Sequence, residues 1–265
     1  MNTSPRTPEE HREFIREVIK LFLFFAAEYL RKHPEETIDS AILRRTSIWE
    51  ITGIQNSELE KELTERLKKL YGQAKTSGEF EEHGWRMLEP HLEWFLSENL
   101  RWEKNVLAKY NGSCVRYDAP STCGLPADYC NFHITNSIAP KSILAEERYT
   151  AECLLRLMDA GEKEFGYGVL RTLTWLNSSP QWLKFFPRQW QENLEEPCNI
   201  VGKLGSWGQI ITSRKTFNYK QGEYIRTNLE LKYKPRASWC TFAVMRKHLA
   251  QFITPEEPRL PGVSS

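Results

Sequence analysis

The sequence lacks a long apolar run. Its most apolar stretch, from Val18 to Leu30, contains Lys20 and Glu28 and is shorter than the roughly 20 residues that a helix needs to cross a bilayer. The N-terminus also lacks the pattern of a secretory signal, a basic segment followed by an apolar one. Six cysteines without such a signal are typical of reduced thiols rather than of a disulfide framework. We therefore expect a soluble protein of the cytoplasm with no membrane partner.

The sequence also lacks the short motifs that identify common enzyme classes. It has no G-x-G-x-x-G, no G-x4-G-K-[ST], no G-x-S-x-G and no H-E-x-x-H. These motifs mark dinucleotide-binding proteins, P-loop NTPases, α/β-hydrolases and zinc metalloproteases. It has no internal repeat and no low-complexity tract either. The motifs therefore indicate no reaction type.

What is present is ordinary globular composition with an uneven charge. Hydrophobic residues make up 40% and charged residues 27% of the 265 positions, which is typical of a folded chain. Residues 1–202 hold 25 Lys and Arg against 31 Asp and Glu, whereas residues 203–265 hold 11 against 4. The C-terminal quarter is therefore cationic, which indicates either a solvated surface or an anion-binding one.

Helix signals dominate the first part of the chain. Thr7, Pro8 and Glu10 form a capping signal before apolar residues that recur every three or four positions as far as Pro34. A similar signal at Ser57 precedes a charged helix, and another helix is predicted from about 85 to 110, with a possible kink at Pro90.

The predicted fold class is α+β, mainly α, in a single domain over residues 1–253. It comprises a body of about six to eight helices, a small three-stranded antiparallel sheet and a final helix. The predicted parts are an N-terminal helical part at 1–112, an irregular loop at 113–141, helices at 142–195, the antiparallel sheet at 203–236, the helix at 238–253 and a flexible tail at 254–265. The sheet rests on the alternation of Leu229, Leu231 and Tyr233 with polar residues.

Four potential zinc ligands lie in the irregular loop. They are Cys114, Cys123, Cys130 and His133, with the spacing C-x8-C-x6-C-x2-H. Thiolate and imidazole are ligands that zinc prefers, and over these 20 residues the set resembles the CCCH zinc fingers of RNA-binding proteins. The last two spacings depart from that family, and the set lacks a paired C-x2-C. The alternative is three unrelated thiols, so we predict no cofactor and keep zinc as a minor hypothesis.

Polar residues embedded among aromatic ones are the candidate site. Small-molecule sites combine apolar and aromatic walls with a few convergent polar groups. His133 is the natural general acid or base, because its unperturbed pKa lies near neutrality. We predict the catalytic residues His133, Asn136 and Asn177 and the substrate-binding residues Trp175, Trp182, Trp207, Gln209 and Arg226. The alternative is that these Asn and Ser residues form caps and turns and that the Trp residues fill the core.

These residues favour a soluble enzyme that acts on a small polar or anionic metabolite, with His133 in an aromatic-lined pocket. The alternative is a non-catalytic binding protein, whose basic and aromatic C-terminal sheet engages nucleic acid or an acidic partner. Nucleic acid is the less favoured partner. The segment of the four potential zinc ligands, around Arg116, Asp118 and Asp128, is not basic, which argues against RNA binding there. The reaction type, the substrate and the oligomeric state stay open.

Overall fold

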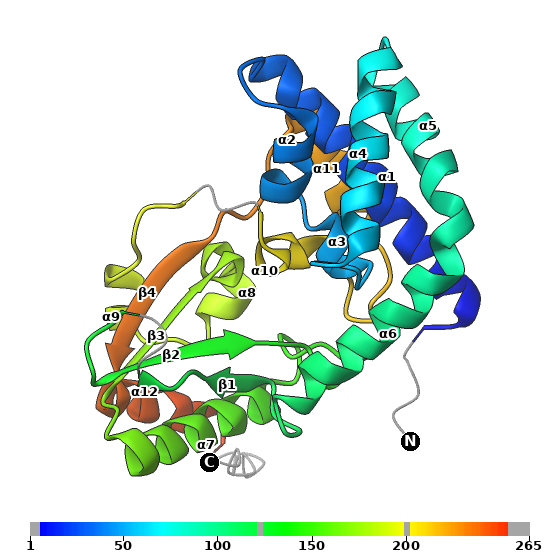
Figure 1. The fold of residues 1–265 in the computed structure, drawn as a ribbon. Coiled ribbons are helices and arrows are strands. Elements are labelled where there is room, and N and C mark those ends of the chain that lie inside the picture. The colour runs from blue at the N-terminus through cyan, green and yellow to red at the C-terminus, as the bar shows by residue number, and fades with distance from the viewer. Residues whose placement is uncertain (1–5, 121–123, 199–201, 254–265) are drawn as a thin grey trace, which may run out of the picture.

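The computed structural model describes residues 6–120, 124–198 and 202–253. Helices fill the N-terminal part of the chain, and a small sheet with further helices follows (Figure 1). The first helices are α1 (Pro8–Lys32), α2 (Ile38–Arg45), α3 (Ile48–Ile51), α4 (Glu58–Gln73), α5 (Ser77–Leu88), the 3-10 turn η1 (Glu89–His91) and α6 (Leu92–Ala108).

Helix α1 is the centre of the helical half. The side chain of Thr7 accepts a hydrogen bond from the backbone of Glu10, whose carboxylate accepts one from the backbone of Thr7, so the predicted capping box is confirmed. Apolar residues lie on several sides of α1, and α5, α2 and α6 pack around it. The helix predicted from 85 to 110 is instead divided at Pro90, because α5 ends at Leu88 and α6 begins at Leu92.

Four strands form one mixed sheet in the order β1-β2-β3-β4. The strands are β1 (Val115–Tyr117), β2 (Tyr129–Ile134), β3 (Val169–Thr174) and β4 (Arg236–Thr241). The β2/β3 pair is parallel, and the two outer pairs are antiparallel. The helices after β2 are α7 (Glu147–Phe165), η3 (Trp175–Ser178), α8 (Pro180–Leu183), α9 (Arg188–Glu192), α10 (Leu204–Trp207), η4 (Gly208–Ile210), α11 (Tyr219–Asn228), α12 (Phe242–Leu249) and η5 (Ala250–Phe252).

The mainly helical α+β class is confirmed, but the three-stranded antiparallel sheet predicted at 203–236 is wrong. That segment forms α10, η4 and α11, and only Arg236 begins a strand. The side chain of Asn218 caps α11, and Leu229 ends it in a left-handed conformation with φ 56°. The alternating residues around Leu231 therefore lie just after the end of a helix and form no strand. A period-two pattern over only a few residues is a weak signal for a strand.

The actual strands lie where the sequence indicated a loop or helices. Strands β1 and β2 fall in the predicted irregular loop 113–141, and β3 falls among the predicted helices of 142–195. Strand β4 also takes the start of the predicted final helix, so α12 begins only at Phe242, with Thr241 as its cap. The predicted tail at 254–265 lies outside the described residues.

One face of the sheet is covered by helices, and the other is accessible to solvent. Cys130, Leu170 and Cys240 are directly paired across β2, β3 and β4 and are fully buried on the face that α7 and α12 cover. These two helices lie beneath the sheet in Figure 1. Residues one position along each strand face the other way, because side chains alternate across a strand. Among these, Leu173 is 42% exposed, so this second face, called the open face below, is accessible to solvent.

The cationic C-terminal quarter is bound to the acidic helical half. Apolar residues of 204–231, including Trp207 and Ile225, belong to the same hydrophobic cluster as α1. Ion pairs accompany this packing: Arg214 with Glu10, Lys215 with Glu103, and Arg226 with Glu81. The charge asymmetry of the sequence is therefore partly neutralised within the molecule.

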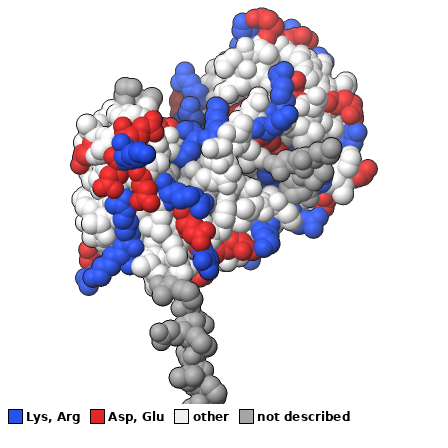
Figure 2. Space-filling model, turned by 90° about the horizontal axis from the view of Figure 1, so that it is seen from below, with Lys and Arg blue, Asp and Glu red and all other residues white. Residues whose placement is uncertain are grey.

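The underside of the molecule also mixes charges of both signs. There Arg246 of α12 forms ion pairs with Asp159 and Glu162 of α7. Figure 2 shows this face, on which acidic and basic side chains lie side by side rather than in a stripe of one sign.

Candidate active site

A cluster of polar side chains occupies the open face between β1 and β2. Arg116 of β1 is directly paired with His133 of β2. Asp118 follows β1, and its backbone N–H donates to the carbonyl of Asn131. The strand register therefore places Arg116, Asp118, Asn131 and His133 on one side of the sheet.

Asp118 is held by several hydrogen bonds. Arg116 Nη1 donates to Oδ1 over 3.0 Å, and Asn131 Nδ2 donates to Oδ2 over 3.1 Å. The hydroxyl of Tyr167 donates to the backbone carbonyl of Asp118 over 2.8 Å. The side chain of Asp118 is only 18% exposed. These hydrogen bonds therefore fix the position of the Asp118 carboxylate independently of His133.

His133 forms a dyad with Asp118. Its Nε2 lies 2.6 Å from Oδ2 of Asp118, which is short and typical of a charge-assisted hydrogen bond. The imidazole is 40% exposed, and within the described residues its Nδ1 has no hydrogen-bond partner. A carboxylate that binds one ring nitrogen fixes the tautomer and leaves the other nitrogen as a proton acceptor. The dyad is thus arranged to move a proton at Nδ1.

Arg171 lies beside this dyad on the open face. In the strand register it is paired with Asn131 on one side and with Trp239 on the other. Arg171 is half-buried as a residue, and within the part of the chain that the structure describes no ion pair or hydrogen bond engages its guanidinium. Trp239 and Tyr129 stack at an angle next to it, with ring centroids 6.3 Å apart. A cation without an acid partner, next to aromatic rings, is suited to bind an anion.

The other predicted catalytic residues have structural partners. Asn136 Nδ2 donates to the carbonyls of Lys141 and Ser213, over 2.9 and 3.1 Å. Asn177 is fully buried and donates to the carbonyls of Thr172 and Arg236, over 3.2 and 2.8 Å. Neither amide contacts the Asp118–His133 dyad through these bonds, and their predicted catalytic role stays a prediction.

The predicted substrate-binding residues are spread over the molecule. Trp182 and Trp207 are fully buried in two different hydrophobic clusters. Trp175 is half-buried against Tyr233, with ring centroids 6.0 Å apart. Gln209 makes two hydrogen bonds of 3.1 Å with the backbone of Tyr233.

The last predicted binding residue, Arg226, lies in the helical half. It makes two hydrogen bonds of 2.8 Å with the carboxylate of Glu81. None of the bonds and ring contacts described for these five residues includes His133.

The predicted zinc ligands do not assemble in the described residues. Cys130 and His133 lie three positions apart in one strand and therefore face opposite sides of the sheet. Cys123 lies outside the described residues. Across residues 6–120, 124–198 and 202–253, no three His, Cys, Asp or Glu side chains gather as a metal ion requires.

In the same ranges, every helix is too short or too polar to span a bilayer.

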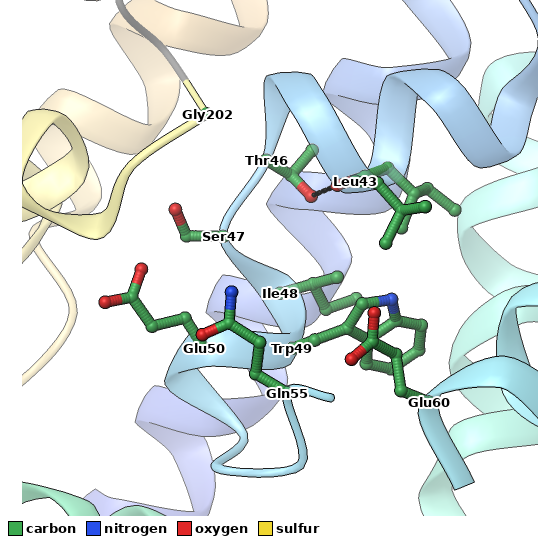
Figure 3. Close-up of a pocket in the computed structure, with 10 residues that line it drawn as sticks. Leu43, Thr46, Ser47, Ile48, Trp49, Glu50, Gln55, Glu60 and Gly202 are labelled. Atoms are coloured by element: carbon green, nitrogen blue, oxygen red, sulfur yellow. Dashed lines mark hydrogen bonds between the residues drawn. The ribbon is translucent and has the colours of Figure 1, made fainter. Parts of the chain in front are cut away.

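Two hollows of the molecule lie away from the dyad. The first has a free volume of about 30 Å³ between α2, α3 and Gly202, with Ser47, Glu50 and Gln55 on its wall (Figure 3). That volume is enough for about one water molecule. The second, about 350 Å³, is open and is bounded by residues of α12, such as Lys247 and His248.

The sequence pattern predicts His133 as a site residue but does not predict Asp118, Asn131 and Arg171 beside it. Asn131 and His133 alternate with the buried Cys130 and Phe132, the period of a half-buried strand. In β3 the same alternation places the side chain of Arg171 on the opposite face of the sheet from those of Leu170 and Thr172. The signal was therefore present, but each strand is too short for it to stand out.

Comparisons with known proteins show no similarity of this chain to a known family or structure. No protein-family model matches it, and neither the curated proteins nor the solved structures contain a significant match.

Proposed function

We propose that the protein is an enzyme that transfers a proton to or from a small anionic substrate at His133. Asp118 orients the imidazole, and Arg171 binds the anionic group of the substrate. The observation that carries the proposal is the 2.6 Å contact between His133 and a carboxylate that Arg116 and Asn131 hold in place. General acid or base catalysis by a positioned side chain contributes about 10² to 10⁴ in rate.

Geometry supports Arg171 as the anion-binding group. Asn131 is its direct neighbour across the sheet, and His133 is the next residue on the same face of β2. Neighbouring strands lie about 4.8 Å apart and each residue advances a strand by about 3.3 Å, so the Cα atoms of Arg171 and His133 are roughly 8 Å apart, which is within reach of an arginine side chain. A carboxylate or phosphate bound by Arg171 would thus place the rest of a small substrate at Nδ1 of His133.

The basic residues of 203–236 support the alternative binding function less well. Arg214, Lys215, Arg226 and Lys234 already have carboxylate partners in the same molecule. An acidic partner would have to compete with these contacts. We therefore keep the enzyme as the proposal.

The first test is binding. Carboxylate-bearing and phosphate-bearing metabolites are screened for thermal stabilisation of the wild-type protein and of Arg171→Gln. We expect at least one compound to stabilise the wild type and to lose its effect in the variant. The matched control is Arg188→Gln, because Arg188 is an exposed arginine of α9 that pairs with Glu192. A hit that binds equally to Arg171→Gln would contradict the role of Arg171.

The second test is turnover. Each binding compound is incubated with the protein, and products are detected by mass spectrometry. His133→Gln should keep binding and lose about 10² to 10⁴ in rate. Binding without any product, in the wild type as in the variant, would show a binding protein and sink the enzyme proposal.

A further inference from the structure

Two aromatic side chains lie on the open face next to Arg171. Trp239 of β4 is the direct cross-strand partner of Arg171, and Tyr129 of β2 precedes by two positions Asn131, which pairs with Arg171 on the other side. The rings of Tyr129 and Trp239 have centroids 6.3 Å apart and planes at 50°. In this geometry neither ring covers the face of the other, so the pair can still stack against another planar group.

These two rings are not part of the core. Both residues are half-buried, and neither is among the described residues that form the two hydrophobic clusters or pack against them. Leu173, on the same face of β3, is also outside both clusters and is 42% exposed. The half-buried Trp175, by contrast, packs against the cluster of the sheet half. Large apolar side chains that gather on one face outside the core are typical of a binding surface.

The charges on the open face favour an anionic ligand. Among the described strand residues, the charged side chains on this face are Arg116 of β1 and Arg171 of β3. The guanidinium of Arg116 is hydrogen-bonded to the carboxylate of Asp118, so these two charges balance each other. Arg171 therefore gives the face a positive charge directly beside the aromatic pair.

We propose that the substrate bound at Arg171 carries a planar aromatic ring close to its anionic group, and that Trp239 and Tyr129 bind this ring. The inference rests on the proposed function, because it uses Arg171 as the anion-binding group. Directly paired residues of an antiparallel sheet have Cβ atoms about 4.5–5.5 Å apart, so one small molecule can contact both Arg171 and Trp239. The ring then lies on the β4 side of Arg171, and His133 lies on the β2 side.

The test compares ligands that share an anionic group and differ in the ring. Aryl carboxylates and nucleotides both have the required chemistry. The pairs are phenylacetate with cyclohexylacetate, and adenosine monophosphate with ribose phosphate, and NMR titrations of the full chain give their dissociation constants. The aromatic member should bind about 2- to 10-fold tighter in the carboxylate pair or about 5- to 100-fold tighter in the nucleotide pair. The pair that shows the preference identifies the source of the ring.

Variants of Trp239 separate ring binding from anion binding. Trp239→Leu should remove the preference for the aromatic ligand and leave the affinity for its ring-free partner unchanged, whereas Trp239→Phe, which keeps a ring, should retain the preference. Trp94→Leu is the matched control, because Trp94 of α6 is 47% exposed and lies outside the sheet. The indole N–H signal of Trp239, assigned by its loss in Trp239→Phe, should shift when the aromatic ligand is added.

Failure of this inference and failure of the proposed function give different results. Equal affinity for both members of each pair, abolished for both in Arg171→Gln, would overturn the ring-binding role and leave the anion-binding role of Arg171 in place. A ring preference that Trp239→Leu retains would overturn the inference too. Binding that Arg171→Gln leaves unchanged, or no binding of either pair, would contradict the proposed function and the inference with it.

Discussion

At the scale of single residues, Asp118 determines what His133 can do. Its carboxylate is engaged by Arg116 and Asn131, and its backbone by Tyr167, so it presents Oδ2 to the imidazole in one geometry. This places the imidazole proton at Nε2 and the lone pair at Nδ1, since the carboxylate can only accept.

We predict that Asp118→Asn changes the tautomer of His133. In the wild type, neutral His133 should carry its proton on Nε2, and the amide of the variant should no longer enforce this, because an amide can also donate. Long-range proton–nitrogen correlation spectra of the ring report the tautomer directly. The control is Asp159→Asn, which lies on α7 and pairs with Arg246. An unchanged His133 spectrum in Asp118→Asn would mean that the carboxylate does not set the tautomer.

His11 is a second residue whose surroundings predict a measurable effect. It is 5% exposed, and its Nε2 lies 2.9 Å from Oδ1 of the fully buried Asn99. Burial, with help from the charge of Arg6, lowers the pKa of His11. The unfolded chain then takes up a proton near pH 6.5 that the folded protein resists.

We therefore predict that stability is lost as the pH falls below about 6.5 and that His11→Gln reduces this loss. The lowered pKa contributes stability that is complete above the unfolded value and is lost as the pH falls towards the folded value. Urea unfolding at pH 7 and pH 5.5 measures the difference. His83→Gln is the control, since His83 is exposed. An equal loss in the wild type and in His11→Gln would refute the assignment.

At the scale of elements, the chain after Gly202 is attached to α3 through Glu50. The carboxylate of Glu50 accepts a hydrogen bond of 3.1 Å from the backbone of Leu204, at the start of α10. Figure 3 shows Glu50 and Ser47 directed towards the side on which the chain passes Gly202. A Cβ atom on Gly202 would lie 2.2 Å from the carbonyl oxygen of Arg44, so only glycine allows this approach.

We predict that Glu50→Gln stabilises the protein at pH 7. Burial raises the pKa of Glu50, against the opposing effects of Leu204 N–H and Lys203. The protonated form contributes stability that is complete below the unfolded pKa of about 4.3 and is lost as the pH rises through the folded value. Glutamine keeps an acceptor for Leu204 without the charge.

The melting temperature should therefore rise by about 2–4 °C at pH 7, the shift for roughly 1 kcal/mol in a chain of this size, and should not change near pH 4. Glu223→Gln, on the exposed side of α11, should leave the melting temperature within the range of an ordinary surface substitution. A lower melting temperature of Glu50→Gln at pH 7 would show that the charged hydrogen bond to Leu204 outweighs the cost of burial.

At the scale of the whole molecule, the cationic end of the chain stabilises the acidic helices. Arg226 of α11 binds the Glu81 carboxylate of α5 through Nη1 and Nη2. Its guanidinium carbon lies 4.8 Å from the ring centroid of Phe24 in α1. Its side chain is 29% exposed and that of Glu81 is 13% exposed, so the pair is partly shielded from water.

A double-mutant cycle of Arg226→Ala and Glu81→Ala should give a coupling energy of about 1–3 kcal/mol in unfolding experiments, because the pair is bidentate and half-buried. Arg226→Ala should leave ligand binding at Arg171 unchanged. A coupling near zero would place the pair among ordinary surface ion pairs. Loss of ligand binding in Arg226→Ala would instead support the binding role that the sequence predicts for Arg226.

Local signals determined the helical half. Thr7 and Glu10 start α1 through neighbours three residues apart, and the apolar residues that follow repeat with the period of a helix. The mainly helical class and the absence of a long apolar span could therefore be read from the chain alone. His133 was also selected from the sequence, on the chemistry of its side chain.

Only the tertiary structure decided the sheet and the partners of His133. Strand β3 pairs with β2 and with β4, the latter about 70 residues further along the chain, and no local pattern encodes such pairing. Register then brought Asp118 to His133 and Arg171 to Asn131, while it separated Cys130 from His133 by the thickness of the sheet. The sequence determined which side chains were available, and strand pairing, which depends on contacts distant in the chain, decided which of them meet.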